Sequence, residues 1–322
     1  MAISRIMLAF DPLVRLLLVA ILLASFLPVT GDGRAIARSV SDGGIFLLFL
    51  LNGLRLPRAD VFAGMRNWRF LLPLSLWCFL GMGAAGWLLW RAGGQFLPEH
   101  IALGLLFLGI LPSTVQSATA YSSLAGGNVA ASVVAAAVIN VTGVFVTAPL
   151  LALLAGTAAV DLDLDGLQRI ATILVLPFVL GQVLQNWLGD WVRERRSLIG
   201  WADKLCIATA VYVAFSGAVE QGLWTLVGPE LWAILLGLVA AFLIIGFGGS
   251  WLLGGAIGLG RQERISFLFA GAQKSIAIGA PLAAVLFPPA IAGLLLLPVL
   301  VYHLLQLVLS APIARKLNPL PG

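Results

Sequence analysis

The sequence predicts an all-α polytopic membrane protein whose ten transmembrane helices form two inverted five-helix repeats. Of its 322 residues, 61% are hydrophobic and only 10% are charged, whereas soluble domains are about 25% charged. Apolar segments of the roughly 20 residues that a bilayer-spanning helix needs recur along the whole chain. The basic residues also collect in alternate loops. This composition excludes a soluble enzyme domain, a nucleic-acid-binding module and a disordered chain.

Ten apolar segments are expected to span the membrane. No Asp, Glu, Lys or Arg occurs among the 21 residues between Arg69 and Arg91. The 61 residues between Glu99 and Asp161 also lack these residues and are long enough for two spans with an interruption. The second and seventh spans are short. The expected spans cover residues 12–28, 40–54, 69–91, 100–124, 128–155, 167–188, 204–220, 229–256, 265–287 and 290–313.

The loop charges predict the orientation. If the N-terminus is cytoplasmic, 14 of the 19 Lys and Arg residues lie in inside segments and 4 lie outside, which leaves Lys274 within a span. Cytoplasmic loops of membrane proteins carry such an excess of Lys and Arg. We therefore expect an integral protein of a bacterial inner membrane with both termini in the cytoplasm.

The ten spans divide into two halves of five. The first repeat is expected over 1–155 and the second over 167–322, with an acidic external linker at 156–166 that contains Asp161, Asp163 and Asp165. Because each half has an odd number of spans, the second half enters the membrane from the opposite side. Inverted repeats of this kind are a transporter architecture.

The fourth span of each half is interrupted by polar residues and a proline. The first interruption reads LPSTVQSATAYSS from Leu111, and the second reads GAQKSIAIGAP from Gly271. Non-helical backbone at membrane depth is tolerated only where it is buried in protein or lines a wet cavity. Interrupted helices at matching positions of two halves indicate a binding site.

These stretches also carry a family resemblance. LPSTVQSATAYSSLAGGNVAASV at 111–133, GAQKSIAIGAP at 271–281 and FLLNGLRLP at 49–57 resemble the bile acid:sodium symporter superfamily, and more closely its SBF-like branch. The resemblance implies a secondary active transporter, a symporter of an organic anion coupled to sodium, protons or both. It further implies a panel domain of helices one, two, six and seven, and a core domain in which the discontinuous helices 4 and 9 cross.

The resemblance also implies an ion-binding set. It assigns sodium ligation to polar side chains of the fourth, fifth and ninth helices: Ser117, Thr119, Asn128, Ser132 and Gln273. One inserted residue offsets Ser117 and Thr119 from the register of the family pattern. Phe269 replaces a sodium-ligating glutamate of the bile acid branch, and Ala136 replaces a second hydroxyl of the fifth helix. These departures weigh against coupling to two sodium ions.

Lys274 is the expected functional cation of the interruption. A lysine at mid-bilayer costs about 2.5–3.5 kcal/mol on insertion scales, and no span-central acid is available to neutralise it. Its ammonium could bind carbonyls and hydroxyls of the opposite break, or release and rebind a proton during the cycle. The alternative is a lysine that snorkels to water at a span end. The other residues assigned to coupling or substrate binding are Ser113, Thr114, Gln116, Ser275 and Asn52.

The sequence argues against three other readings. A catalytic site needs a nucleophile, a base and an orienting group, and the spans offer one Lys, one His and no central acid. No metal-ligand spacing occurs, so no cofactor or metal other than Na⁺ is expected. A channel would need a continuous charged or carbonyl-lined pore. The expected partners are the lipid bilayer and a small organic anion, and no nucleic acid. A regulatory membrane protein that keeps the fold without robust transport remains the alternative function.

Overall fold

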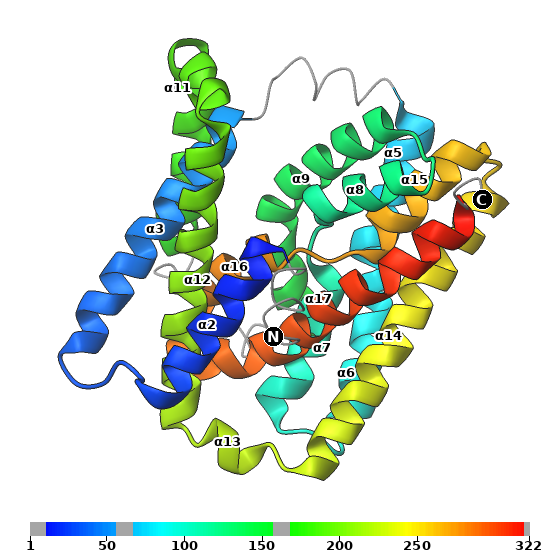
Figure 1. The fold of residues 1–322 in the computed structure, drawn as a ribbon. Coiled ribbons are helices and arrows are strands. Elements are labelled where there is room, and N and C mark those ends of the chain that lie inside the picture. The colour runs from blue at the N-terminus through cyan, green and yellow to red at the C-terminus, as the bar shows by residue number, and fades with distance from the viewer. Residues whose placement is uncertain (1–10, 56–66, 157–167, 319–322) are drawn as a thin grey trace, which may run out of the picture. The chain divides into compact units, whose positions relative to one another are not determined.

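The described residues of the computed structural model, 11–55, 67–156 and 168–318, contain helices and no strand (Figure 1). Eight helical segments among them are long and apolar enough to cross a bilayer: Gly33–Arg55, Trp68–Gly93, Val129–Ala155, Gln168–Glu194, Arg196–Glu220, Pro229–Ala256, Arg261–Leu286 and Pro289–Leu317. Two shorter apolar helices are Pro12–Phe26 and Glu99–Ile110.

Each of the eight long segments overlaps an expected span, and the two shorter helices overlap the first and fourth. The fourth expected span, 100–124, is divided at residues 111–115. The two spans expected to be short are longer helices, Gly33–Arg55 and Arg196–Glu220. The added turns of both helices carry charged residues, which the apolar criterion for a span had excluded.

The chain forms two compact units. The first unit comprises the described parts of Met1–Pro57, Val160–Leu226 and Ala280–Leu294. Helix α3 packs along α11, and α12 packs against α2 and α3 (Figure 1). This unit contains α2 (Pro12–Phe26), α3 (Gly33–Arg55), η3 (Ala171–Val175), α11 (Leu176–Glu194), α12 (Arg196–Glu220) and α13 (Leu223–Leu226). It also contains the parts of α16 (Ile276–Leu286) and α17 (Pro289–Leu317) that fall within 280–294.

Close backbone approach and ion pairs hold the first unit together. A Cβ on Gly53 of α3 would lie 2.3 Å from the carbonyl oxygen of Phe178 on α11, so only glycine fits there. Arg34 forms an ion pair with Glu220 between α3 and α12. Two further pairs join Arg55 at the C-terminal end of α3 to Asp203, and Asp42 near the middle of α3 to Arg169. Such partners explain why α3 begins before the expected apolar core.

The second unit comprises the described parts of Arg58–Ala159, Val227–Gly279 and Leu295–Gly322. Helix α6 packs on α7, α8 on α9, and α14 on α15. Besides the beginning of α16 (Ile276–Leu286) and most of α17 (Pro289–Leu317), it contains α5 (Trp68–Leu76), η1 (Trp77–Gly81), α6 (Met82–Gly93), α7 (Glu99–Ile110), α8 (Gln116–Leu124), α9 (Val129–Ala155), α14 (Pro229–Ala256) and α15 (Arg261–Ala272).

The division of helices between the two units resembles the panel and core grouping that the family resemblance implies. Expected spans one, two, six and seven lie in the first unit, and spans three, four, five and eight lie in the second. The segment 280–294 differs, because it groups with the first unit.

Candidate functional site

The first helix break follows α7. The helix ends at Ile110, and Leu111 adopts an extended conformation with φ −67° and ψ 148°. Leu111 precedes Pro112, and the residue before a proline is disfavoured in the α conformation because the proline ring crowds it. Helix α8 begins at Gln116. The sequence Leu111-Pro112 therefore explains where the helix stops.

The second break follows α15, and a side chain of α17 stabilises it. Gln273 is extended, with φ −85° and ψ 141°. Gln306 accepts the Lys274 backbone N–H through Oε1 at 2.8 Å and donates from Nε2 to the Lys274 carbonyl at 3.0 Å. These two bonds replace the helical partners that Lys274 lacks. Gln306 is fully buried, and a buried backbone group without a partner is costly.

The two breaks contact each other directly. The backbone N–H of Ser275 donates to the carbonyl of Pro112 at 2.9 Å. Nearby, a Cβ on Gly279 would lie 2.7 Å from a methyl carbon of Leu111. Non-helical backbone from two distant parts of the sequence thus meets in the interior of the second unit, as membrane proteins require of such segments.

The Lys274 side chain ends in a cage of backbone carbonyls. Its ammonium donates to the oxygens of Cys78, Gly109 and Leu111, each at 2.8 Å. An ammonium has three N–H donors, so all three are used. Lys274 is 1% exposed, which does not fit the snorkelling alternative. We refer to these three oxygens as the carbonyl cage.

Two features of the backbone free the cage oxygens from helical bonding. Gly109 and Leu111 belong to the end of α7, where the last carbonyls of a helix have no helical partner. The negative end of the helix dipole also favours a cation there. The third oxygen is freed by η1, in which the Met82 N–H bonds to the Trp77 oxygen and not to the Cys78 oxygen. Single π-turns of this kind leave a carbonyl free.

Gln273 is the centre of a hydrogen-bonded cluster with Thr114, Ser117 and Ser310, which we call the Gln273 group. Its Oε1 accepts the hydroxyls of Thr114 at 2.6 Å and Ser117 at 2.5 Å. Its Nε2 donates to the Ser310 hydroxyl of α17 at 3.0 Å. The hydroxyls of Thr114 and Ser117 are also 2.6 Å apart. The amide of Gln273 therefore joins both breaks to α17.

Within the described part of the chain, no carboxylate pairs with the Lys274 ammonium. None of the ion pairs among residues 11–55, 67–156 and 168–318 includes Lys274. The same residues contain no group of three or more His, Cys, Asp and Glu side chains suited to a metal ion. The site is therefore a hydroxyl, amide and carbonyl environment around one buried positive group.

Comparison with known proteins assigns the family. The model of the SBF-like CPA transporter family matches residues 11–319. The chain belongs to this family. It is thus an integral membrane protein of a transporter family, and the family resemblance of its sequence motifs is confirmed.

The sequence is also similar to individual proteins, which supports this family assignment. It is 37% identical to "Uncharacterized protein PA2026" of Pseudomonas aeruginosa, over 93% of this chain and 90% of the relative. It is 35% identical to "Putative symporter YfeH" of Escherichia coli, over 95% and 92%. It is 24% identical to "Sodium/bile acid cotransporter 7" of Mus musculus, over 85% and 81%.

The ion-binding residues expected in this SBF-like protein are not all hydrogen-bonded to one another. Ser117 and Gln273 are hydrogen-bonded, as described above. Asn128 lies at the N-cap of α9, where its Oδ1 accepts the Ala131 N–H at 3.0 Å. Ser132 is buried, and its hydroxyl has no hydrogen-bond partner within the described part of the chain. The same holds for the hydroxyl of Thr119.

The coupling and substrate residues also have different surroundings. Thr114 belongs to the Gln273 group, and Ser275 is buried and accepts the Ile278 N–H through its hydroxyl at 3.3 Å. Ser113 is buried, and its carbonyl accepts the Asn140 side-chain amide at 2.8 Å. Gln116 is exposed. Asn52 belongs to α3 of the first unit, where it accepts a hydrogen bond from Arg55 at 3.4 Å.

Several polar residues of the site were missing from the expected set. Gln306 and Ser310 face the second break from α17, and Asn140 supports the first from α9. A signal existed in the sequence, because Gln306 and Ser310 are four residues apart and share a helix face with His303. Gln306 bonds to the His303 ring nitrogen Nδ1 at 2.9 Å. Polar side chains within apolar spans are rare and mark functional or bundle-facing positions.

Proposed function

We propose that this protein is a secondary active transporter that carries a small organic anion together with sodium, protons or both. In this proposal, helices 4 and 9 cross at their breaks, and the protein gives alternating access to that crossing from the two sides of the membrane. The observation that carries the proposal is the buried ammonium of Lys274 among three carbonyls at the meeting point of the two breaks. Intramembrane cations usually serve substrate, ion or proton pathways.

Lys274 supplies a fixed positive charge in this mechanism. Carbonyl oxygens are the ligands with which proteins replace the hydration shell of a monovalent cation. The ammonium occupies such a ligand set, so it stands where a free coupling ion would otherwise bind. The absence of an acid at Phe269 fits this exchange, because a second positive ion would repel the ammonium. The chain then needs fewer coupling ions than a carrier that has the acid.

Ser132 and Thr119 are the proposed ligands of a remaining ion, together with Ser117, Asn128 and Gln273. The hydroxyl oxygens of Ser132 and Thr119 are buried and have no hydrogen-bond partner among the described residues. Buried polar atoms usually have partners, and a bound cation would supply one. Sodium is the first candidate, since the mouse relative is named a sodium/bile acid cotransporter.

The proposed topology has ten spans, inverted repeats at 1–155 and 167–322, and both termini in the cytoplasm of a bacterium. One helix ends at Ile110 and another at Ala272, and each is followed by an extended residue. This similarity supports the repeats. The linker 156–166 lies almost entirely outside the described residues. Reporter fusions after Leu162 and after Leu320 test the topology, with outside and inside signals expected respectively.

Uptake into proteoliposomes tests the transport function. The purified protein is reconstituted, and radiolabelled organic anions, among them bile acids and short carboxylates, are offered under an inward sodium gradient or an inward proton gradient. We expect at least one anion to accumulate, and an ionophore that collapses the gradient should abolish this accumulation. If none of the anions accumulates under either gradient, the regulatory alternative replaces the transporter.

A further inference from the structure

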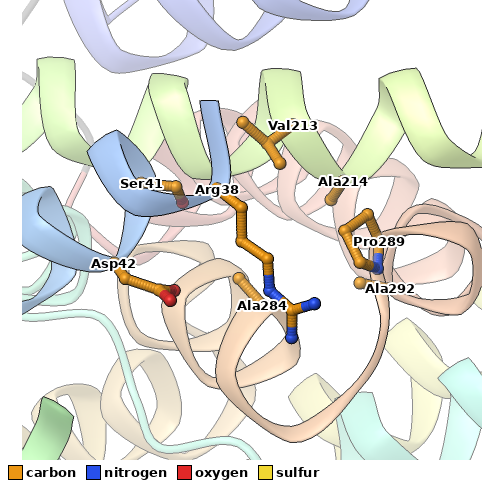
Figure 2. Close-up of a pocket in the computed structure, with 8 residues that line it drawn as sticks. All are labelled: Arg38, Ser41, Asp42, Val213, Ala214, Ala284, Pro289 and Ala292. Atoms are coloured by element: carbon orange, nitrogen blue, oxygen red, sulfur yellow. The ribbon is translucent and has the colours of Figure 1, made fainter. Parts of the chain in front are cut away.

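A small pocket lies within the first unit. Its polar side is formed by Arg38, Ser41 and Asp42 of α3. Its apolar side includes Ala284 of α16 and the first turn of α17 at Pro289 and Ala292 (Figure 2). All these residues belong to one compact unit.

The charges of this pocket are unbalanced. Both carboxylate oxygens of Asp42 accept from the same guanidinium nitrogen of Arg169, at 2.9 and 3.0 Å. Arg38, one helical turn before Asp42, forms no hydrogen bond or ion pair with any described residue. Two arginines therefore flank one carboxylate, and the five N–H donors of Arg38, an exposed residue, have no acceptor among the described residues.

Arg38 points into the pocket. Figure 2 shows its guanidinium extended past Ala284 toward Pro289 and Ala292, on the side away from Asp42. The neighbouring hydroxyl of Ser41 also lines the pocket; Ser41 is 2% exposed and its oxygen has no hydrogen-bond partner among the described residues. An unpaired planar cation, an unpaired hydroxyl and an apolar wall are complementary to a carboxylate attached to an apolar group.

We propose that this pocket binds the carboxylate of an organic anion, with Arg38 as the principal ligand and Ser41 as a hydrogen-bond donor. The guanidinium fork matches a carboxylate in two parallel hydrogen bonds. The pocket itself is no larger than the carboxylate, so the carbon skeleton lies at its rim, where the apolar side chains distinguish an organic carboxylate from an inorganic anion. Arg169 adds a positive field, while its pairing with Asp42 keeps Arg38 free.

The proposal rests on the proposed function only for the chemical class of the ligand. Equilibrium binding to the full-length protein in detergent tests it without any transport step. Benzoate and taurocholate are titrated calorimetrically as carboxylate and sulfonate probes, benzamide as the neutral analogue and sulfate as the inorganic anion. We expect benzoate to bind, benzamide and sulfate not to bind, and the Arg38→Gln variant to bind benzoate at least about tenfold more weakly.

Matched variants separate this site from general changes of charge. Arg34→Gln removes one positive charge from the same helix, but Arg34 is paired with Glu220 outside the pocket, so benzoate affinity should be unchanged. Arg38→Lys should give an intermediate loss, because the charge stays and the fork is lost. Asp42→Asn should raise the affinity, because it removes the only carboxylate of the pocket.

Three results would overturn the proposal. They are equal benzoate affinity in Arg38→Gln and wild-type protein, no benzoate binding at millimolar concentration, and equal binding of sulfate and benzoate. If the wild-type protein transports an anion but does not bind benzoate, the pocket proposal alone is refuted. Binding without any uptake would refute the transport proposal and leave the pocket in place.

Discussion

The ammonium nitrogen of Lys274 and the backbone oxygen of Cys78 lie 2.8 Å apart, although 196 residues separate them in the sequence. That oxygen is free because the third span makes one π-turn before α6 begins. Together with two carbonyls from the end of α7, it lets the helix backbone solvate a buried charge that no acid of the described residues neutralises.

Truncation of Lys274 should leave the carbonyl cage unsatisfied. We expect Lys274→Ala to lose about 1–3 kcal/mol of stability for each carbonyl that finds no new partner. n-Propylammonium has the length and charge of the missing side chain, so it should raise the melting temperature of this variant in a saturable manner. Thermal unfolding of the detergent-solubilised protein measures both effects.

Two controls separate the charge from the lost volume. Propanol has the same carbon chain without the charge and should not rescue Lys274→Ala. Lys274→Met fills the space and should not respond to n-propylammonium. An equal response of wild-type protein and Lys274→Ala would show that the amine acts elsewhere.

Ser132 and Thr119 should affect ion dependence more than stability. Their hydroxyls make no hydrogen bond with the described residues, so Ser132→Ala and Thr119→Val remove no protein contact and should leave the melting temperature unchanged or raise it. If the hydroxyls are ion ligands, the sodium concentration for half-maximal uptake should rise about tenfold or more. Ser123→Ala, at an exposed position of α8, is the matched control. Unchanged sodium dependence in both site variants would remove them from the ion site.

Gln306 should be essential for the second break. Gln306→Leu leaves the Lys274 backbone N–H and carbonyl unpaired, which costs about 1–3 kcal/mol for each group. We expect a lower melting temperature and faster hydrogen exchange at residues 273–276. Gln262→Leu makes the same exchange at an exposed position of α15 and should change stability by less than about 0.5 kcal/mol. Equal behaviour of the two variants would contradict the role of Gln306.

Gly109 should tolerate no side chain. A Cβ there would lie 2.6 Å from the Met82 oxygen and 3.1 Å from the Gly86 Cα, so Gly109→Ala must push α6 away from α7. Since α7 ends with the Gly109 and Leu111 carbonyls and the η1 turn just before α6 carries the Cys78 carbonyl, stability and uptake should fall together. Gly237→Ala on α14 meets nothing within 4 Å and should be neutral or slightly stabilising. Uptake by Gly109→Ala at the wild-type rate would contradict this packing argument.

The sequence predicts the places of the helix breaks, but not the ligands of the lysine. Pro112 and the hydroxyl run after it mark the first break, and the polar residues at 273–275 mark the second. The π-turn at Trp77–Gly81 has no such mark within its apolar span, so the Cys78 oxygen could not be foreseen. Gln306 lies 32 residues beyond Lys274, and only the packing of α17 brings them together.

The extent of the helices was also only partly predictable. Hydropathy locates the apolar part of α3, but its first turns carry Arg34 and Asp42. Their partners, Glu220 and Arg169, are 186 and 127 residues away. Local composition contains no information on such pairs. The same limit applies to Arg38, whose lack of a partner becomes visible only in the folded unit.

In the proposed transport cycle, the Lys274 ammonium acts as a built-in cation. The most direct test is the initial rate of anion uptake into proteoliposomes, measured against sodium concentration and against pH for wild-type protein and for Lys274→Gln and Lys274→Glu. We expect both variants to insert normally into the membrane but to change their sodium or pH dependence, with Lys274→Glu gaining dependence on a free cation. Wild-type rates with unchanged sodium and pH profiles in both variants would contradict it and make Lys274 a structural residue.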